Sequence, residues 1–224
     1  MSDALTLTSL PLFPLGSVLY PGGLLPLRIF EVRYLDMIGR CHKMGAPFGV
    51  VALTEGTEVR RPSGASAQGA LPSGDGFARE DFSAVGTLAT ITEFSVPQPG
   101  LMVIECVGTQ RFEISRREKL RHGLWVADVS RLGDDQAVKI PADLQGTADA
   151  LGKVIRTLQQ RSVAAALIPL RKPYQLDDCG WVANRWCELL PIPLELKQRL
   201  MALDNPLLRL ELVSDILERT GISL

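Results

Sequence analysis

The chain has 224 residues, of which 46% are hydrophobic and 22% are charged, and its formal net charge is −1. This balance is typical of a globular protein and gives no bulk attraction to nucleic acid or to anionic membranes. The first ten residues lack the basic and apolar regions of a signal peptide, and no stretch approaches the roughly 20 apolar residues of a membrane span. We therefore expect a cytoplasmic protein without a membrane segment, in which the four dispersed cysteines are free, mostly buried thiols.

The first long apolar stretch, residues 9–34 (SLPLFPLGSVLYPGGLLPLRIFEVRY), contains four prolines. Proline has no amide donor, so this density predicts edge strands or extended segments that wrap a core. The Pro-Gly-Gly step at 21–23 predicts a turn. From Phe30 the apolar spacing becomes helical, which predicts a helix over residues 30–44. We expect Phe30 and Tyr34 to dock this helix against the sheet.

Short apolar segments separated by turn residues predict an antiparallel sheet in the next part of the chain. The expected strands cover residues 48–53, 85–94, 101–107, 111–116 and 124–129. The step Gly108-Thr109-Gln110 predicts a tight turn between two of them. With two N-terminal strands the total is six or seven, which is enough to close a small barrel.

Residues 54–84 are rich in Gly, Ser, Ala and Pro and contain few large apolar side chains. This composition predicts a flexible insertion between two strands, which is either a mobile loop or a functional flap. Paired acids occur at Glu80-Asp81, Asp134-Asp135 and Asp177-Asp178. We attribute all three pairs to helix capping and solvation rather than to acid–base catalysis.

Helical patterns replace the strand signals after residue 135. Helices are expected over residues 143–161, from a cap at Asp177 or Asp178 to Leu190, over 194–203 and over 207–219. The step Asp204-Asn205-Pro206 before the last of them is typical of a cap followed by proline in the first turn. Strands followed by helices predict an α+β fold, with a β-rich part at 1–135 and a helical part at 136–224. The apolar arc of the last helix is wide, so this helix either packs on two sides or contacts a second subunit.

Motifs for common enzyme chemistry are missing from the sequence. It contains no phosphate-binding loop, no G-x-S-x-G or S-x-x-K nucleophile setting and no Cys-x-x-Cys pair. We therefore expect no catalytic activity, no cofactor and no metal site.

A basic cluster lies between Arg111 and His122 and includes Arg116, Arg117, Lys119 and Arg121. It is either a solvated hairpin face or a phosphate-binding surface. Trp181 and Trp186 are five residues apart on one expected helix and point in different directions. One of them suits the core, and the other can cover a groove or a partner surface.

Three stretches together resemble one known family. The stretch LPLFPLGSVLYPGGLLPLRIFEVRY resembles the start of the Lon protease N-terminal domain, also called the Lon substrate-binding domain. The segments VGTLATITEF and GLMVIECVGTQRFEI resemble its second block of strands. LPIPLELKQRLMALDNPLLRLELV resembles its closing helices. The resemblance covers nearly the whole chain in the same order.

This resemblance implies an α+β fold, in which a PUA-like antiparallel β pseudo-barrel with one inserted helix precedes a helical subdomain. In Lon proteases the domain precedes ATPase and peptidase modules and helps to hold protein substrates. Neither the phosphate loop nor the nucleophile motif of those modules occurs here, so we expect a free-standing, non-catalytic relative.

We therefore predict a module that binds polypeptide segments or a partner protein through apolar surface between the β-rich part and the helices, with an exposed strand edge available to extended peptides, and with a role in protein quality control. RNA binding through the Arg111–His122 hairpin is the alternative, and a small-molecule module is a third hypothesis. The candidate binding residues are Glu31, Arg33, Tyr34, Arg116, Arg117 and Trp181.

Overall fold

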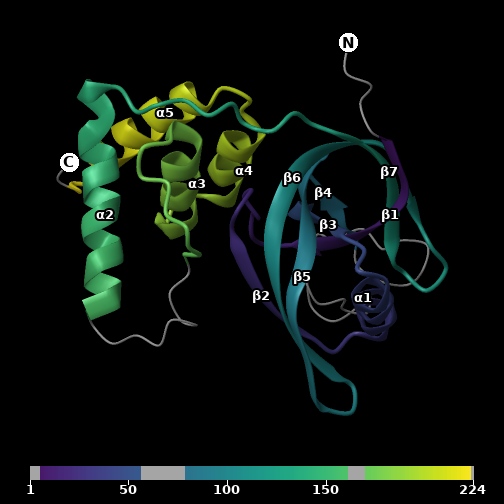
Figure 1. Ribbon diagram of the computed structural model, residues 1–224. Coiled ribbons are helices and arrows are strands. Elements are labelled where there is room, and N and C mark those ends of the chain that lie inside the picture. Colours follow the sequence, from purple (N-terminus) through teal and green to yellow (C-terminus); the bar gives the residue numbers. More distant parts are fainter. Residues whose placement is uncertain (1–5, 57–78, 161–169, 223–224) are drawn as a thin grey trace. The chain divides into compact units, whose positions relative to one another are not determined.

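The structure is a computed structural model that describes residues 6–56, 79–160 and 170–222. Its internal contacts divide the chain into two units. The first, which we call the β unit, comprises residues up to 21 together with 25–133, and the second, the helical unit, comprises 22–24 and 134–224. The β unit contains the sheet and one helix, and the helical unit contains the other helices (Figure 1).

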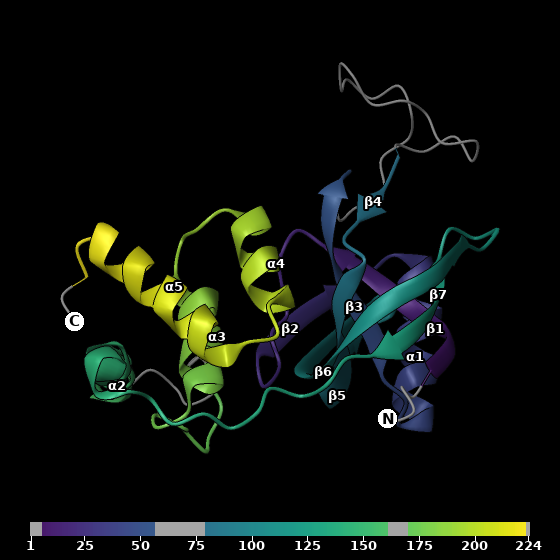
Figure 2. The same cartoon turned by 90° about the horizontal axis from the view of Figure 1, so that it is seen from above.

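The sheet of the β unit has seven strands within the described residues. They are β1 (Thr6–Leu15), β2 (Leu24–Ile29), β3 (Phe48–Glu55), β4 (Asp81–Phe82), β5 (Val85–Gln98), β6 (Leu101–Lys119) and β7 (Trp125–Arg131). The strand order is β1-β7-β6-β5-β3-β4, and β2 pairs with β6. β1 also pairs in parallel with β3, from Leu12 opposite Gly49 to Leu15 opposite Ala52. This parallel pairing connects β1, at one end of the strand order, to β3 near the other end. The remaining pairings within the sheet are mainly antiparallel, and Figure 2 shows the strands from above. The predicted α+β fold is confirmed.

Alternating side chains of β1 supply two apolar clusters, as expected for a strand that is covered on both faces. Leu10 and Leu12 lie in a cluster with Phe112 and Val129, whereas Phe13 lies in the cluster that receives the helix α1 (Val32–Met44). α1 buries one face against this second cluster. The residues of that face are Arg33, Tyr34, Met37, Ile38 and Cys41.

The docking of α1 agrees only in part with the sequence prediction. The Tyr34 ring stacks on Phe13 with its centroid 4.0 Å away, as expected of a docking residue. Phe30, however, is 54% exposed, so the prediction that it docks the helix is wrong. The helix begins only after its N-cap residue Glu31, and Phe30 therefore lies before the first turn. At the other end Gly45, with φ of 61°, closes the helix in the left-handed conformation.

The predicted turn at residues 108–110 does not exist, because β6 runs without interruption through it. Gly108 instead serves a close backbone approach: a Cβ at this position would collide with the carbonyl oxygen of Tyr20 and crowd the Leu19 side chain. Glycine inside a strand often marks such a contact rather than a turn. The two strands expected at 101–107 and 111–116 are therefore one.

The predicted insertion at 54–84 is shorter than expected. Both of its ends belong to the sheet, because Leu53 pairs with Phe82 and Glu55 pairs with Asp81. Residues 57–78, where most of the predicted insertion falls, lie outside the described part of the chain. The flexibility expected of it stays a prediction.

The helical unit contains α2 (Gln145–Gln160), which follows a short 3-10 turn at Ala142–Leu144, then α3 (Cys179–Leu189), α4 (Leu194–Ala202) and α5 (Pro206–Arg219). Two predicted caps are confirmed. Asp178 accepts a hydrogen bond from the Trp181 amide at 2.8 Å, and Asn205 accepts from the amides of Leu207 and Leu208.

The wide apolar arc of α5 is partly uncovered within the helical unit. Leu208 and Leu212 are each 40% exposed, one turn apart on the same helix. A second subunit remains one explanation, and it stays a prediction. All four cysteines are free and buried, as expected. In the described ranges, no helix is long and apolar enough to cross a membrane.

A buried arginine organises the helical unit. Arg209 is 1% exposed and donates to the carbonyl oxygens of Leu200, at 3.0 Å, and Leu203. It also donates to Asn184 Oδ1 at 3.0 Å and to Asp135 Oδ1 at 3.1 Å. Asp135 is therefore the counter-ion of a buried arginine and not one of a solvated pair, which corrects the sequence interpretation.

We predict that Gly108→Ala destabilises the protein, because the added methyl group forces the strand away from the Tyr20 carbonyl group. The free energy of unfolding should fall by about 1–3 kcal/mol, as for other overpacked sites. Gly133→Ala is the matched control, since nothing lies within 4 Å of a Cβ at that position. Chemical denaturation of both variants measures the difference, and an equal effect would contradict the close approach.

Arg209→Met should cost about 3–5 kcal/mol of unfolding free energy, because it leaves the Asp135 carboxylate and two carbonyl groups without their buried donor. The exposed Arg219, on the same helix, provides the control substitution Arg219→Met. Urea denaturation monitored by circular dichroism compares the two. If both variants lost equal stability, the buried network would not be the cause.

Candidate functional site

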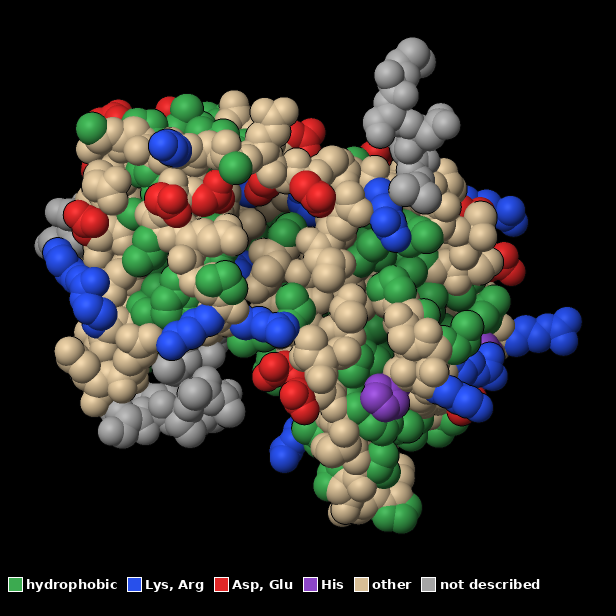
Figure 3. All heavy atoms as spheres, viewed as in Figure 1, with side chains coloured by type: hydrophobic (Ala, Val, Ile, Leu, Met, Phe, Trp, Pro, Cys, Tyr) green, Lys and Arg blue, Asp and Glu red, His purple; other side chains and the backbone are tan. Residues whose placement is uncertain are grey.

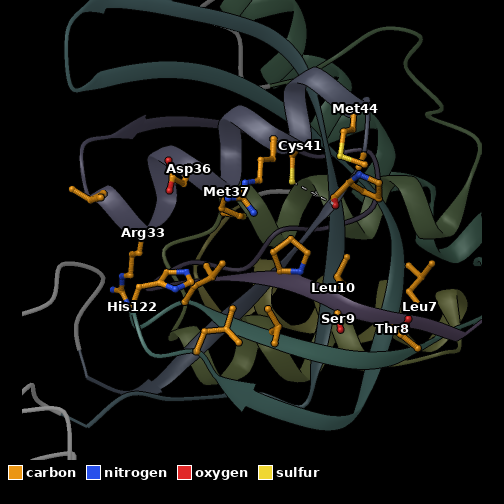
Figure 4. A pocket seen from close by; sticks show the side chains of 18 residues that line it. Leu7, Thr8, Ser9, Leu10, Arg33, Asp36, Met37, Cys41, Met44 and His122 are labelled. Atoms are coloured by element: carbon orange, nitrogen blue, oxygen red, sulfur yellow. Dashed lines mark hydrogen bonds between the residues drawn. The ribbon is translucent and has the colours of Figure 1, made fainter.

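The β unit contains a groove of about 760 Å³ between α1 and the first half of β1, which we call the α1–β1 groove. Figure 4 shows residues of α1 in a row opposite Leu7–Leu10 of β1, with His122 near the Arg33 end. Its full lining is Leu7, Thr8, Ser9, Leu10, Pro11, Val32, Arg33, Asp36, Met37, Arg40, Cys41, Met44, Ala46, Pro47, Leu120, His122, Leu124 and Val126.

The strand pairing explains why a groove forms here. β1 pairs with β7 from Thr6 to Leu12, whereas its pairing with β3 begins only at Leu12. The chain that precedes β3 is α1, which leaves the sheet instead of continuing alongside β1. The groove occupies the space between this helix and the half of β1 that β3 does not reach.

Apolar side chains make up most of the groove. Met37 and Cys41 form its buried wall on α1, and Cys41 Sγ lies 4.0 Å from the carbonyl oxygen of Pro47. Val32 and Met44, at the two ends of the helix, are each 77% exposed. Figure 3 shows hydrophobic side chains at the surface of this unit next to basic and histidine side chains. Exposed apolar groups that border an apolar hollow are typical of a binding site rather than of ordinary surface.

Charged side chains lie at the margin of the groove. Asp36 and Arg40 are exposed and one turn apart on α1, and His122 is exposed in the β6–β7 turn. Within the described residues none of the three takes part in an ion pair. They leave the margin polar without giving it a strong net charge.

Arg33, at one end of the groove, is buried and saturated by its own contacts. Its Nε lies 3.0 Å from Glu31 Oε2, its Nη2 lies 3.0 Å from Glu80 Oε1, and its Nη1 donates to the Gly123 carbonyl oxygen at 3.0 Å. Its guanidinium also covers the Tyr34 ring at 4.4 Å. Burial alone would lower the pKa of Arg33, but Tyr34 and the two carboxylates outweigh it and raise the pKa above its ordinary value.

The network continues beyond Arg33 through Glu80. Glu80 Oε2 accepts from the Trp125 indole at 3.0 Å and lies 3.7 Å from Lys119 Nζ. Next to it, Arg117 pairs with Asp81 at 2.7 Å and covers the Phe82 ring. Burial opposes ionisation of Asp81, but the hydrogen bonds from Arg117 and from the Phe82 amide, together with the charges of Arg117 and Arg79, outweigh it and lower the pKa of Asp81. Glu80 and Asp81 are thus ion-pair partners of basic residues. This corrects the sequence interpretation, which attributed the pair to capping and solvation.

The six predicted site residues do not form one site. Glu31, Arg33 and Tyr34 lie together at one end of the groove, but only Arg33 lines it. Arg117 belongs to the neighbouring network, and Arg116 is exposed, 4.0 Å from Glu118. Trp181 belongs to the helical unit, where it is half-buried beside Tyr174 and Arg185.

The basic cluster at 111–122 is divided in the same way. Arg111 is buried and donates to the Gly133 carbonyl oxygen, and Lys119 and Arg117 face the carboxylates of Glu80 and Asp81. The cluster therefore presents fewer available cations than its sequence suggests.

Sequence reasoning missed most of the groove. Asp36, Met37, Arg40 and Met44 follow each other at helical spacing, but this spacing alone does not reveal which face meets a hollow instead of a core. No signal marked Leu7 and Thr8, because the N-terminal half of a paired strand is normally covered. Among the described residues, no three His, Cys, Asp or Glu side chains gather in a way that could hold a metal ion.

Comparisons with known proteins give a consistent result. The family model that matches is that of the ATP-dependent protease La (LON) substrate-binding domain, over residues 9–219. The chain is similar to the crystal structure of a Lon N-terminal domain protein from Xanthomonas campestris, with 31% identity, a TM-score of 0.67, and coverage of 93% of this chain and 98% of that chain. The N-terminal domain of Mycobacterium avium complex Lon protease is 15% identical, with a TM-score of 0.55 and coverage of 92% and 96%, and it is similar in fold. No curated protein matches.

We predict that Glu80→Gln lowers the free energy of unfolding by about 3 kcal/mol, because Arg33 then stays buried beside a neutral amide. The same substitution at Glu55, whose pair with Arg79 is solvent-exposed at 3.7 Å, should cost no more than about 1 kcal/mol. Thermal and urea denaturation of both variants provide the measurement. Similar losses at the two sites would show that the buried network does not stabilise the fold.

Proposed function

Because the chain belongs to the Lon substrate-binding domain family, we propose that it binds polypeptide segments, and that it does so in the α1–β1 groove. The family establishes a substrate-binding module. Two observations support the groove as the site. Its volume is about 760 Å³ and its lining is mostly apolar, and two of the side chains at its border, Val32 and Met44, are each 77% exposed. Removal of such surface from water favours binding of apolar side chains at roughly 25 cal/mol per Å².

The groove suits side chains of an unfolded chain better than a single charged ligand. Its wall contains Met37 and Cys41, which are soft and adapt to different apolar shapes. The one buried charge in the lining, Arg33, is satisfied by Glu31 and Glu80 and so has little affinity left for an anion. Discrimination by charge is therefore weak, as expected for a module that accepts varied polypeptides.

The Arg33 network supports the proposal because it keeps the groove open before a ligand arrives. It connects the first turn of α1 to Glu80 and to Gly123 in the β6–β7 turn. A preformed site loses less conformational entropy on binding than a flexible one. We propose that these contacts position the groove and do not touch the ligand directly.

The matched family model is that of the substrate-binding part of Lon, and we propose that this chain is likewise non-catalytic and contributes to protein quality control. We also propose that the boundary between its two parts lies near residue 135, as the sequence indicates. The cytoplasmic location and the PUA-like character of the barrel stay predictions.

The RNA-binding hypothesis stays an untested alternative, and no specific structural observation favours it. Arg116 and Arg121 are exposed, but their neighbours Arg117 and Lys119 are engaged with carboxylates. A phosphate backbone would compete with Asp81 and Glu80 for these cations.

Val32→Asp should weaken binding of an unfolded polypeptide about tenfold or more, because a desolvated carboxylate replaces an apolar contact at the edge of the groove. The probe is reduced and carboxymethylated lactalbumin, labelled for fluorescence anisotropy. Val32 is highly exposed and occupies the first helical turn, where Asp is well tolerated, so the variant should fold normally.

Val96→Asp is the matched control, because Val96 is also an exposed valine, 54% accessible, but lies on the β5–β6 hairpin outside the groove lining. It should retain the affinity of the unchanged protein. If wild-type protein bound no unfolded chain, the function itself would be refuted. If Val96→Asp abolished binding and Val32→Asp did not, the site would lie on the hairpin instead.

A further inference from the structure

The half of β1 that borders the groove has one open edge. On one side it pairs with β7, where Leu7 lies opposite Val129 and Leu10 opposite Ala127. On the other side the parallel pairing with β3 starts at Leu12. Between Leu7 and Pro11 no described strand occupies this second side. An open strand edge offers unpaired amide and carbonyl groups to an incoming chain.

The lining of the groove indicates that this edge faces into it. Five consecutive residues, from Leu7 to Pro11, line the groove, whereas a strand that presents only one face contributes every second residue. Leu10 is especially informative: it is 5% exposed and belongs to the apolar cluster with Leu12, yet it also lines the groove. Leu10 therefore lies between the apolar cluster and the groove.

A bulge shapes the open edge. Ser9 has a φ of +54°, unusual for a residue other than glycine, and its amide donates to Asp128 Oδ1 at 3.0 Å. The register with β7 shifts between Leu7 and Leu10 at this point. The Ser9 amide thus already has an acceptor on β7 and is not available to an added chain.

The remaining walls match the alternating side chains of an extended chain. On one side of an added strand lie the apolar residues Val32, Met37 and Met44 of α1, and the polar residues Asp36 and Arg40 lie at the margin. An added strand in which apolar and polar residues alternate places its apolar side chains on α1 and leaves its polar side chains near water. From Leu7 to Pro11 the edge spans about 16 Å at about 3.3 Å per residue.

We propose that the occupant of the groove is an extended polypeptide segment with alternating apolar and polar residues, which adds to the open edge of β1 as a short strand. This inference rests on the proposed polypeptide binding and specifies how the segment is held. Main-chain hydrogen bonds to β1 supply sequence-independent affinity, and contacts with α1 select apolar side chains at every second position.

The experiment uses a fluorescent, end-capped nonapeptide in which leucine and threonine alternate, with a lysine at each end for solubility. Two further versions carry N-methyl groups, one on every leucine amide and the other on every threonine amide. An added strand directs only alternate amides to its partner, so one methylated version should lose at least tenfold in affinity and the other should bind almost normally. A shift by one residue cannot rescue the weak version, because it would place threonines on α1.

The possible outcomes separate the two proposals. Loss of affinity in one methylated version only, together with weaker binding of the parent peptide by Val32→Asp, supports strand addition. Equal affinity of both versions, with the Val32→Asp effect retained, overturns strand addition and leaves groove binding intact. An equal and large loss in both versions also overturns it, since no edge-specific pairing would then exist. If the parent peptide and unfolded lactalbumin both fail to bind, the proposed function itself fails.

Discussion

The arrangement of the β unit depends on the burial of one guanidinium group. Arg33 enters the structure at the first turn of α1 and meets carboxylates from Glu31 and Glu80 and the carbonyl group of Gly123. A charge in this position is tolerated only because every partner is present at once. Three segments that are far apart in the sequence are thereby fixed around one end of the groove, and the direction in which α1 leaves the sheet is fixed with them.

The groove itself results from a topological mismatch. β1 is longer than the part of β3 that pairs with it, because the chain before β3 is helical. A strand in place of α1 would have covered the edge and filled the hollow. The helix instead places apolar side chains opposite uncovered backbone. The proposed recognition surface therefore comes from the way two regular elements meet.

The sequence predicted the element types well, because apolar period, caps and prolines act locally. Asp178 and Asn205 were identifiable as caps from their position before a helical pattern. Errors arose where distant segments decide. From the sequence alone Gly108 resembles a turn residue, because the Tyr20 carbonyl group that lies beside it is distant in the chain. In the same way Glu80 resembles a solvated acid, because its partner Arg33 is distant in the chain. The candidate site was harder to predict, since it depends on which edge of β1 stays open, and no local pattern encodes that.

The bulge at Ser9 also bears on self-association through the open edge of β1. A long, flat, uncovered strand recruits copies of itself and grows into fibres. Here the left-handed conformation of Ser9 and the register shift between Leu7 and Leu10 make the strand irregular after a few residues. A chain added to this edge as proposed can form only a short ladder, which limits the affinity that main-chain hydrogen bonds supply. An edge interrupted in this way is a poor template for the pairing of copies of the chain with one another.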